Sequence, residues 1–600
     1  MEYCRYVLKM HSRQYSIFLF LNMIKKRIIS ILLILGLLVP VMGKSRKVVI
    51  KIMETTDVHG NFFGYNFKEN HPLEGGFPQV SAYVNSQRDS LGKENCILID
   101  AGDILQGQPC VYYTNFIDTN SPHLTSETMN FMGYDAAAFG NHDIEAGHPV
   151  FNRWVADCKF PVLGANIISK ATGEPYAKPY CIIEREGVKI AILGMVTPAI
   201  PMWLPEKLWQ GLQFEDMVKS ARKWVPLILE KEKPDVMVGL FHCGLRSHGQ
   251  NGYNENPAEE IALNIPGMDI VFYGHDHQAY CQQVTSKVSG NKVWLLNAGG
   301  ETVNVAEAIL TCTVSNGKVT QKKIEGNIAS VKGIKPDEAF MKHFSKKQDE
   351  VQKFVSEEVG VLDKPIYGAD YFFGNSTMGD LMHHVQFKQM KADISLVTPL
   401  VYDDVVKPGK VAVRDIFILY QYENMINVFE LTGKEVRDAL EYSYSRWVNT
   451  MKSPDDHALN IRMQEGKKPR FGTATFCLMS AAGISYEVDL SQPVGKRVRI
   501  LKMKDGSSFS LEKTYRVAVN SYVGSGGCGL LTEGTGLSMS ELRSRIKETS
   551  DHEFRYYIID FFRSAKGALQ IPALSDWKFV PDSLVKKALE TDRKILFGEN

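Results

Sequence analysis

Short apolar runs in the first half of the chain each stop at residue types that bind metal ions. Runs at 48–53, 97–99, 136–139, 236–241 and 270–272 lead, in that order, into Asp57-Val58-His59, Gly102-Asp103, Gly140-Asn141-His142-Asp143, His242 and Gly274-His275-Asp276-His277. Such a run is typical of a sheet strand that is buried on both faces, with its carboxyl end at a ligand crevice. The pattern therefore predicts that these polar residues meet in one cleft.

The wider pattern between residues 47 and 324 alternates short apolar strands with helical segments, which predicts a layered α/β domain. Residues 214–232 have helical spacing and end before Pro234, so we expect a helix there. Residues 293–319 contain shorter strands and an Asn316-Gly317 turn signal. We expect these strands to form an antiparallel extension that closes the domain.

Residues 334–360 have the spacing of an amphipathic helix, which we expect to link two domains. The second half predicts helices near 376–391 and 433–448 and strands near 485–490 and 515–521, an α+β arrangement. Its polar tail beyond Asp582 is predicted to be a closing helix. The domains are accordingly predicted at 44–333 and 361–600, with the linker helix at 334–360.

Length and composition agree with two folded domains. The chain has 600 residues, more than one hydrophobic core usually serves, and 44% of them are apolar, with no disordered or collagen-like bias. The N-terminal region looks like an export signal, because Lys25-Lys26-Arg27 precedes a short apolar stretch at 28–42. A retained membrane anchor is the alternative, but the stretch is short for a bilayer and no Cys follows it for lipid attachment.

We expect residues 1–43 to be removed, with translation starting at Met23, and the mature protein to be periplasmic or secreted. The removed segment holds six Lys or Arg and one Glu, so the formal net charge changes from +1 to −4. No basic stripe remains to hold a nucleic-acid polymer, and no stable membrane anchor is expected. The sequence leaves the oligomeric state open.

Cysteine usage predicts no disulfide framework. Ten cysteines are present; Cys4 lies in the removed segment, and the remaining nine include no C-x-x-C pair. Cys96 and Cys312 lie inside apolar runs and are expected to be small core residues. We therefore expect the hydrophobic cores, without a covalent link, to stabilise the protein.

The polar residues after the five runs can hold two divalent cations. The candidate ligands are Asp57, His59, Asp103, Asn141, His242, His275 and His277. Asp103 is the natural bridge, because a carboxylate can span two ions about 3.5–4 Å apart. Nitrogen and oxygen donors without thiolate favour Mn, Zn, Co or Fe and do not choose among them. A single His after a strand is often only a hydrogen-bonded core residue, but five motifs in one order favour a metal site.

In this order, the motifs D-x-H, G-D, G-N-H-D, a single H and G-H-x-H resemble the set of the calcineurin-like metallophosphoesterases. The resemblance implies a four-layer α/β/β/α sandwich with two metal sites that share Asp103. It assigns Asp57, His59 and His277 to one ion, and Asn141, His242 and His275 to the other.

The same resemblance implies a catalytic role for a residue that is not a ligand. His142 is expected to face the scissile phosphate, where it stabilises developing charge or protonates the leaving oxygen. Its partner is expected to be Glu145, with Asp143 as the competing candidate and a solvated loop position as the alternative for Glu145.

The second half resembles the C-terminal domain of the 5'-nucleotidase superfamily, which carries the nucleoside pocket. The motifs that carry the resemblance lie at 372–381, 419–424, 431–436, 481–486 and 520–527. An aromatic ring that stacks on a nucleobase contributes roughly 1–3 kcal/mol. Tyr522 and Tyr422 are the expected stacking residues, and Asn424, Gly526 and Gly527 complete the predicted substrate-binding set.

Two departures from typical 5'-nucleotidases refine the expected substrate. The stretch 398–404 lacks the phosphate-holding Arg of that family, and Cys528 stands where an Asp would hold ribose. Both make the chain similar to exported 2',3'-cyclic-nucleotide 2'-phosphodiesterase/3'-nucleotidases, metal-dependent hydrolases of small nucleotides. A 5'-nucleotidase or UDP-sugar hydrolase is the alternative. A surface-binding module that has lost catalysis is the alternative from another class.

Overall fold

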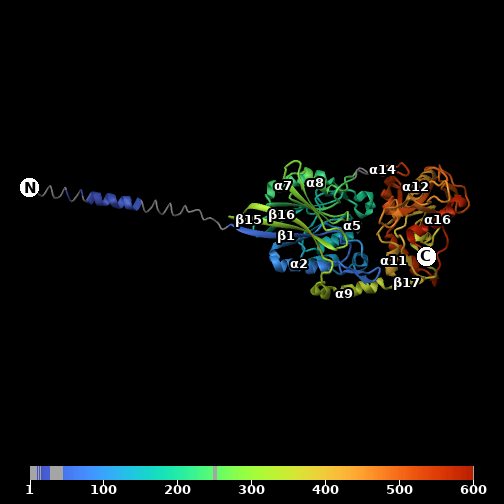
Figure 1. The fold of residues 1–600 in the computed structure, drawn as a ribbon, viewed down its shortest axis with the longest axis horizontal. Helices are drawn as coiled ribbons and strands as arrows, with labels where there is room; N and C mark the ends of the chain where they lie inside the picture. The colour runs from blue at the N-terminus through green and yellow to red at the C-terminus, as the bar shows by residue number, and fades with distance from the viewer. Residues whose placement is uncertain (1–9, 11–12, 14, 28–44, 248–252, 599–600) are drawn as a thin grey trace, which may run out of the picture.

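The computed structural model describes residues 10, 13, 15–27, 45–247 and 253–598. Residues 15–27 form a helix that stands clear of the two domains (Figure 1). Among the described residues, no helix has the length and apolarity needed to cross a membrane. The predicted signal stretch at 28–42 and its cut site lie outside the described residues.

Two six-stranded sheets form the centre of the N-terminal domain. Their strand orders are β16-β15-β1-β4-β5-β6 and β13-β14-β12-β11-β9-β8, in which β6 is Val162–Leu163, β8 is Tyr180–Arg185, β9 is Val188–Val196 and β13 is Tyr280–Thr285. The strands that precede the metal-binding motifs are β1 (Arg46–Thr55), β4 (Cys96–Asp100), β5 (Ala136–Ala138), β11 (Val236–His242) and β12 (Ile270–Tyr273). β1, β4 and β5 are parallel neighbours in one sheet, and β11 and β12 are parallel neighbours in the other.

The two sheets pack face to face and helices cover their outer faces. Ile50, Ile52 and Ile97 from the first sheet share a buried cluster with Ile190 and Val238 from the second. The outer faces are covered by α2 (Phe77–Leu91), α4 (Leu124–Met132) and α6 (His148–Asp157) on the first sheet and by α7 (Met217–Glu232) and α8 (Ala258–Asn264) on the second. The expected four-layer α/β/β/α sandwich is confirmed.

The predicted antiparallel extension is present and longer than expected. β14 (Lys292–Asn297) joins the second sheet, while β15 (Asn304–Ser315) and β16 (Lys318–Ser330) form a long hairpin on the first. Asn316 and Gly317 at its turn have φ values of 52° and 72°, which match the twist of the flanking strands. The predicted helix at 214–232 starts later, at Met217, because residues Leu212–Phe214 form strand β10.

The predicted linker helix is α9 (Glu338–Val355). Its apolar face, with Phe340, Phe344 and Val351, is buried in the core of the first domain. The linker is therefore fixed to the metal-binding half of the molecule along its length (Figure 1).

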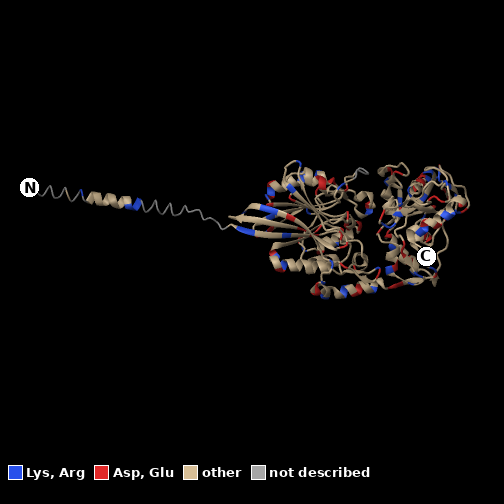
Figure 2. Ribbon diagram, in the orientation of Figure 1, with Lys and Arg blue, Asp and Glu red and all other residues tan. Residues whose placement is uncertain are grey.

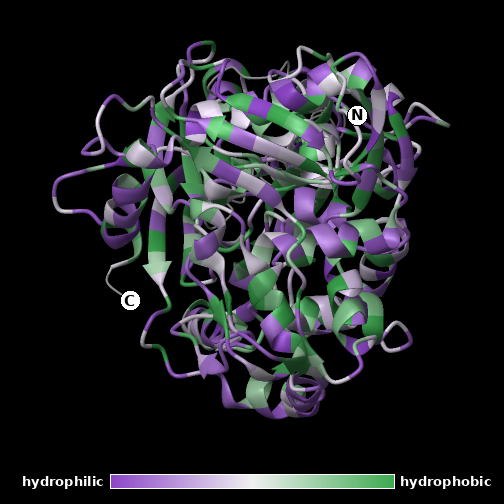
Figure 3. Ribbon diagram, turned by 90° about the vertical axis from the view of Figure 1, so that its right-hand side faces the viewer, coloured by the Kyte–Doolittle hydropathy of each residue, from purple (hydrophilic) through white to green (hydrophobic). Residues whose placement is uncertain are grey.

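The C-terminal domain is built on a five-stranded sheet of order β25-β19-β28-β22-β29, in which β19 is Ile394–Val397, β22 is Ile426–Thr432, β25 is Ser480–Ala482 and β29 is Ile546–Thr549. The predicted elements appear as α10 (Thr377–Gln389), α12 (Gly433–Trp447), β26 (Ile484–Asp489), β28 (Thr514–Asn520) and α16 (Asp582–Phe597). Basic and acidic residues are interspersed over both domains in the view of Figure 2. Hydrophobic and hydrophilic bands alternate along many of the ribbons in Figure 3.

The expectation of a protein without a disulfide was wrong for one pair. Cys477 and Cys528 are bonded across a sequence separation of 51 residues. A pair this distant has no spacing signature, so only the tertiary structure brings the two thiols together. Cys96 and Cys312 are free and buried, as expected of small core residues.

Candidate active site

The metal-binding motifs meet because the carboxyl ends of their strands point to the same end of the two sheets. Two groups of His and Asp side chains result, and within each group the ligand atoms lie within 4.8 Å of one another. The first group is Asp57, His59 and His277, and the second is Asp103, His242 and His275.

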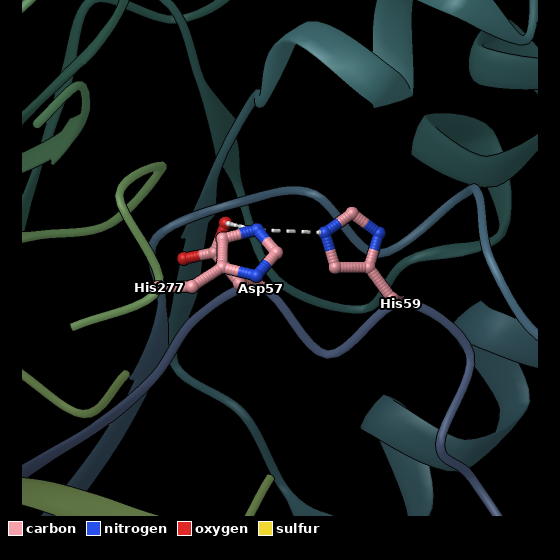
Figure 4. Close-up of side chains that lie close together, drawn as sticks. All are labelled: Asp57, His59 and His277. Carbon is pink, nitrogen blue, oxygen red and sulfur yellow. Dashed lines mark hydrogen bonds and ion pairs between the residues drawn. The ribbon is translucent and has the colours of Figure 1, made fainter. Parts of the chain in front are cut away.

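The first group is held at the mouth of the cleft. His277 Nε2 lies 3.3 Å from Asp57 Oδ1 and 3.3 Å from His59 Nε2 (Figure 4). His59 Nδ1 lies 3.1 Å from the carbonyl oxygen of Gln106. Because a carbonyl can only accept, Nδ1 carries the proton of His59, and its Nε2 presents a lone pair to the group.

The second group is deeper, and the side-chain amide of Asn141 lies beside it. His242 is fully buried, and its Nδ1 donates to the carbonyl oxygen of Ala101 at 2.9 Å. Its Nε2 lies 3.1 Å from Asp103 Oδ2 and 3.1 Å from Asn141 Oδ1. Asp103 Oδ2 is also 4.0 Å from His59 Nε2, so this carboxylate lies between the two groups.

The donor chemistry of both groups fits divalent cations. Around the second group, a carboxylate oxygen of Asp103, the amide oxygen of Asn141 and the Nε2 atom of His242 converge in the protein interior. Oxygen and nitrogen donors of this kind suit divalent cations. The second nitrogen of His59 and of His242 is fixed by a backbone carbonyl, which is how metal-ligating imidazoles are usually oriented.

The backbone at these positions is unusual. Five of the seven candidate ligands have left-handed φ values, between 45° and 73°: Asp57, His59, Asp103, His275 and His277. Such values are uncommon for residues other than glycine, and they cluster at functional sites where the surrounding structure compensates for the strain. The sheet edges therefore hold these ligands in conformations that the local sequence alone does not favour.

His142 is the second residue of the short helix α5 (Asn141–Glu145), beside the second group. Its backbone N–H donates to Asp103 Oδ1 at 2.8 Å, and its Nδ1 lies 2.5 Å from Glu145 Oε2. Burial lowers the pKa of His142, but the carboxylates of Asp103 and Glu145 raise it by more, to about 10. The ring is thereby oriented with Nε2 as the nitrogen left for a ligand in the cavity.

Asp143, the competing partner of His142, is engaged elsewhere. Its carboxylate accepts from the backbone N–H groups of Gly140, Asp103, Ile104 and Leu105 at 2.7–3.1 Å. These contacts fasten the Asp103 loop to α5. In the structure His142 therefore pairs with Glu145, and Asp143 stabilises the loop that carries Asp103.

A cavity of about 230 Å³ opens between the two domains next to these side chains. It is lined by Asn141, His142, Glu145, Trp203, Leu204, His275, Leu400, Tyr422, Asn424, Phe476 and Tyr522. Of the predicted substrate residues, Tyr422, Asn424 and Tyr522 therefore share one cavity with metal-site residues. Gly526 and Gly527 do not line it, although Gly527 packs against the ring of Tyr522.

The sequence interpretation missed several residues of this site. The ring of Trp203 lies tilted against that of His275, with centroids 5.5 Å apart. Phe476 lines the cavity from the C-terminal domain. Glu255 Oε1 lies 2.9 Å from His275 Nε2. None of the three lies in a motif, so no local signal could have found them.

Comparisons with known proteins agree with both halves of this arrangement. The family model of calcineurin-like phosphoesterases matches residues 50–279, and that of the 5'-nucleotidase C-terminal domain matches residues 358–533. The chain belongs to the 5'-nucleotidase superfamily of calcineurin-like phosphoesterases. Members of this family use divalent metals, so the protein is a metal-dependent phosphoric ester hydrolase.

Individual relatives are distant. The chain is 24% identical to a 2',3'-cyclic-nucleotide 2'-phosphodiesterase/3'-nucleotidase of Yersinia enterocolitica, over 80% of this chain and 81% of the relative. It is 25% identical to the trifunctional nucleotide phosphoesterase YfkN of Bacillus subtilis, over 80% of this chain but only 36% of that longer protein.

Among solved structures, a Staphylococcus aureus protein described provisionally as a 5'-nucleotidase superposes with a TM-score of 0.71 at 19% identity. The match covers 88% of this chain and 99% of that one. This likeness supports the two-domain family fold.

Proposed function

We propose that this protein is an exported enzyme that hydrolyses 2',3'-cyclic nucleotides and 3'-nucleotides to nucleoside and phosphate with two divalent metal ions. One observation carries the proposal: the cavity that contains Tyr422 and Tyr522 also contains His142 and the candidate ligands Asn141 and His275. A base that stacks on the tyrosines is therefore close to the groups that act on phosphate.

The chemistry divides between the ions and the side chains. Bound divalent ions polarise a phosphoryl oxygen and lower the pKa of water to about 7. Asp57, His59 and His277 would hold one ion and Asn141, His242 and His275 the other, with Asp103 between them. His142 presents Nε2 to the departing ribose oxygen, and Glu145 keeps its ring in that orientation through Nδ1. The apolar wall of Trp203 and Leu204 limits water on that side of the cavity.

Two features favour a cyclic or 3'-substrate over a 5'-nucleotide. The stretch 398–404 brings no Arg to the cavity and contributes Leu400 instead. Cys528, where a ribose-binding Asp is expected from the family resemblance, is bonded to Cys477 and offers no carboxylate to the ribose hydroxyls. The alternative remains a 5'-nucleotidase with different phosphate contacts.

The deciding experiment compares initial rates of the purified protein, loaded with Mn²⁺ or Zn²⁺, on 2',3'-cyclic AMP, 3'-AMP and 5'-AMP. We expect kcat/KM to be highest for the first two substrates. A clear preference for 5'-AMP would establish the alternative, and no turnover of any of the three would refute the proposed substrates.

A substitution tests the assigned role of His142. His142→Ala should keep the metal content of the wild type and lower kcat about 10²- to 10⁴-fold, the usual contribution of a positioned acid. His343→Ala, which alters an exposed histidine of α9, is the matched control. Unchanged turnover in the His142 variant would remove this residue from the mechanism.

A further inference from the structure

Phe476 is an aromatic side chain in an unusual place. It lies in the three-residue turn η6 (Thr475–Cys477), is 38% exposed, and lines the cavity. The preceding segment 448–474 contains only the two-residue strands β23 (Ile461–Arg462) and β24 (Arg470–Phe471). Regular secondary structure therefore does little to fix the position of the Phe476 ring. A large apolar side chain at a cavity wall is typical of ligand contact.

The disulfide supplies the missing restraint. Cys477, the neighbour of Phe476 in the chain, is bonded to Cys528, which follows the glycines of the loop after Tyr522. Cys528 Sγ lies 3.9 Å from the Tyr522 hydroxyl oxygen and 3.8 Å from the Phe476 carbonyl oxygen. The same covalent link thus anchors the backbone of Phe476 beside Tyr522.

The two rings meet edge to face. Their centroids are 5.9 Å apart with an interplanar angle of 80°. Perpendicular rings cannot both stack on one planar base, so Phe476 does not duplicate the role proposed for Tyr522. It limits the space beside that ring and presents an apolar wall to a base bound there.

We propose that Phe476 determines specificity for the nucleobase and that the Cys477–Cys528 disulfide positions its ring. This inference rests on the proposed function, because it assigns Phe476 to the nucleoside part of the same substrate. Phe476 and the disulfide act on recognition of the base, and the metal-binding side chains act on phosphate.

The first test is the variant Phe476→Ala, with Phe476→Tyr as the conservative replacement and Tyr367→Ala as a control for an exposed ring outside the cavity. KM for the preferred nucleotide and the inhibition constant of adenosine should both rise about fivefold in Phe476→Ala, the effect expected of one aromatic contact. The inhibition constant of inorganic phosphate and kcat should not change. Phe476→Tyr and Tyr367→Ala should retain the wild-type KM.

The second test asks whether the disulfide acts through Phe476. Cys477 and Cys528 are both replaced by Ser, in the wild type and in the Phe476→Ala background. In the wild type this change should raise KM for the nucleotide, and in the Phe476→Ala background it should add no further increase. Inhibition by phosphate reports whether each variant remains folded.

Failure of the proposed function and failure of the role assigned to Phe476 give different results. If the wild type hydrolyses no nucleotide, the proposed function fails, and adenosine binding by calorimetry still tests Phe476. If the wild type is active and Phe476→Ala binds adenosine as tightly as the wild type, the assignment of Phe476 is overturned. A full additional KM effect of the two Ser substitutions in the Phe476→Ala background would overturn the role of the disulfide.

Discussion

Arg555 holds the loop that carries Tyr422 in place. The loss in free energy of unfolding on its removal follows from the contacts it makes. The guanidinium is fully buried; it donates to Tyr420 O at 2.9 Å, Gln421 O at 2.6 Å and Glu423 Oε1 at 2.8 Å. It also lies 5.1 Å from the ring centroid of Tyr112, in the metal-binding domain. One side chain therefore ties the substrate loop to both domains.

Arg555→Met keeps the apolar stem and removes the charge and every donor. Glu423, which is 8% exposed, is then a buried carboxylate without its partner. Removing one partner of a buried ion pair costs about 3–5 kcal/mol, so we expect a loss of that size in the free energy of unfolding of the C-terminal domain. Adding Glu423→Gln removes the unpaired charge and should recover about 2 kcal/mol.

The assay is urea unfolding, in which the transition of the C-terminal domain is followed separately because two domains need not unfold together. Arg563→Met is the matched control on the same helix, α15 (Phe554–Arg563), since its ion pair with Glu357 is exposed. That change should cost less than about 1 kcal/mol. Wild-type stability of Arg555→Met, or a double variant no more stable than the single one, would refute the reasoning.

Three further predictions concern the metals, the catalytic pair and pH. A chelator should abolish turnover and lower the melting temperature, because bound ions stabilise the folded state, and added Mn²⁺ should restore both. Glu145→Ala should lower kcat, and in a His142→Ala background it should have no further effect, as kinetics of the double variant will show. Burial raises the pKa of Glu553 to about 7 against its usual 4.5. Between pH 4.5 and about 7 the folded state therefore binds one proton more than the unfolded state. The free energy of unfolding of the wild type accordingly falls as pH rises through this range. The stability of Glu553→Gln should not show this fall. Its free energy of unfolding, measured by urea unfolding, should therefore rise by about 3 kcal/mol relative to that of the wild type between pH 4 and 8.

The sequence by itself determined the fold class and the family. Apolar runs of strand length set the two sheets, and the residues placed directly after them set which side chains reach the sheet edge. Both are local properties, because a strand's burial and its carboxyl end are encoded within a few residues. For the same reason the main helices and the β15–β16 hairpin were predictable, to within a few residues at their ends.

Only the tertiary structure decided which distant groups meet. It paired His142 with Glu145 because the carboxylate of Asp143 is taken up by the backbone of the Asp103 loop. It joined Cys477 to Cys528 and placed Phe476 in the cavity across long sequence separations. Such contacts depend on how whole elements pack, and neither the spacing nor the periodicity of residues along the chain contains that information.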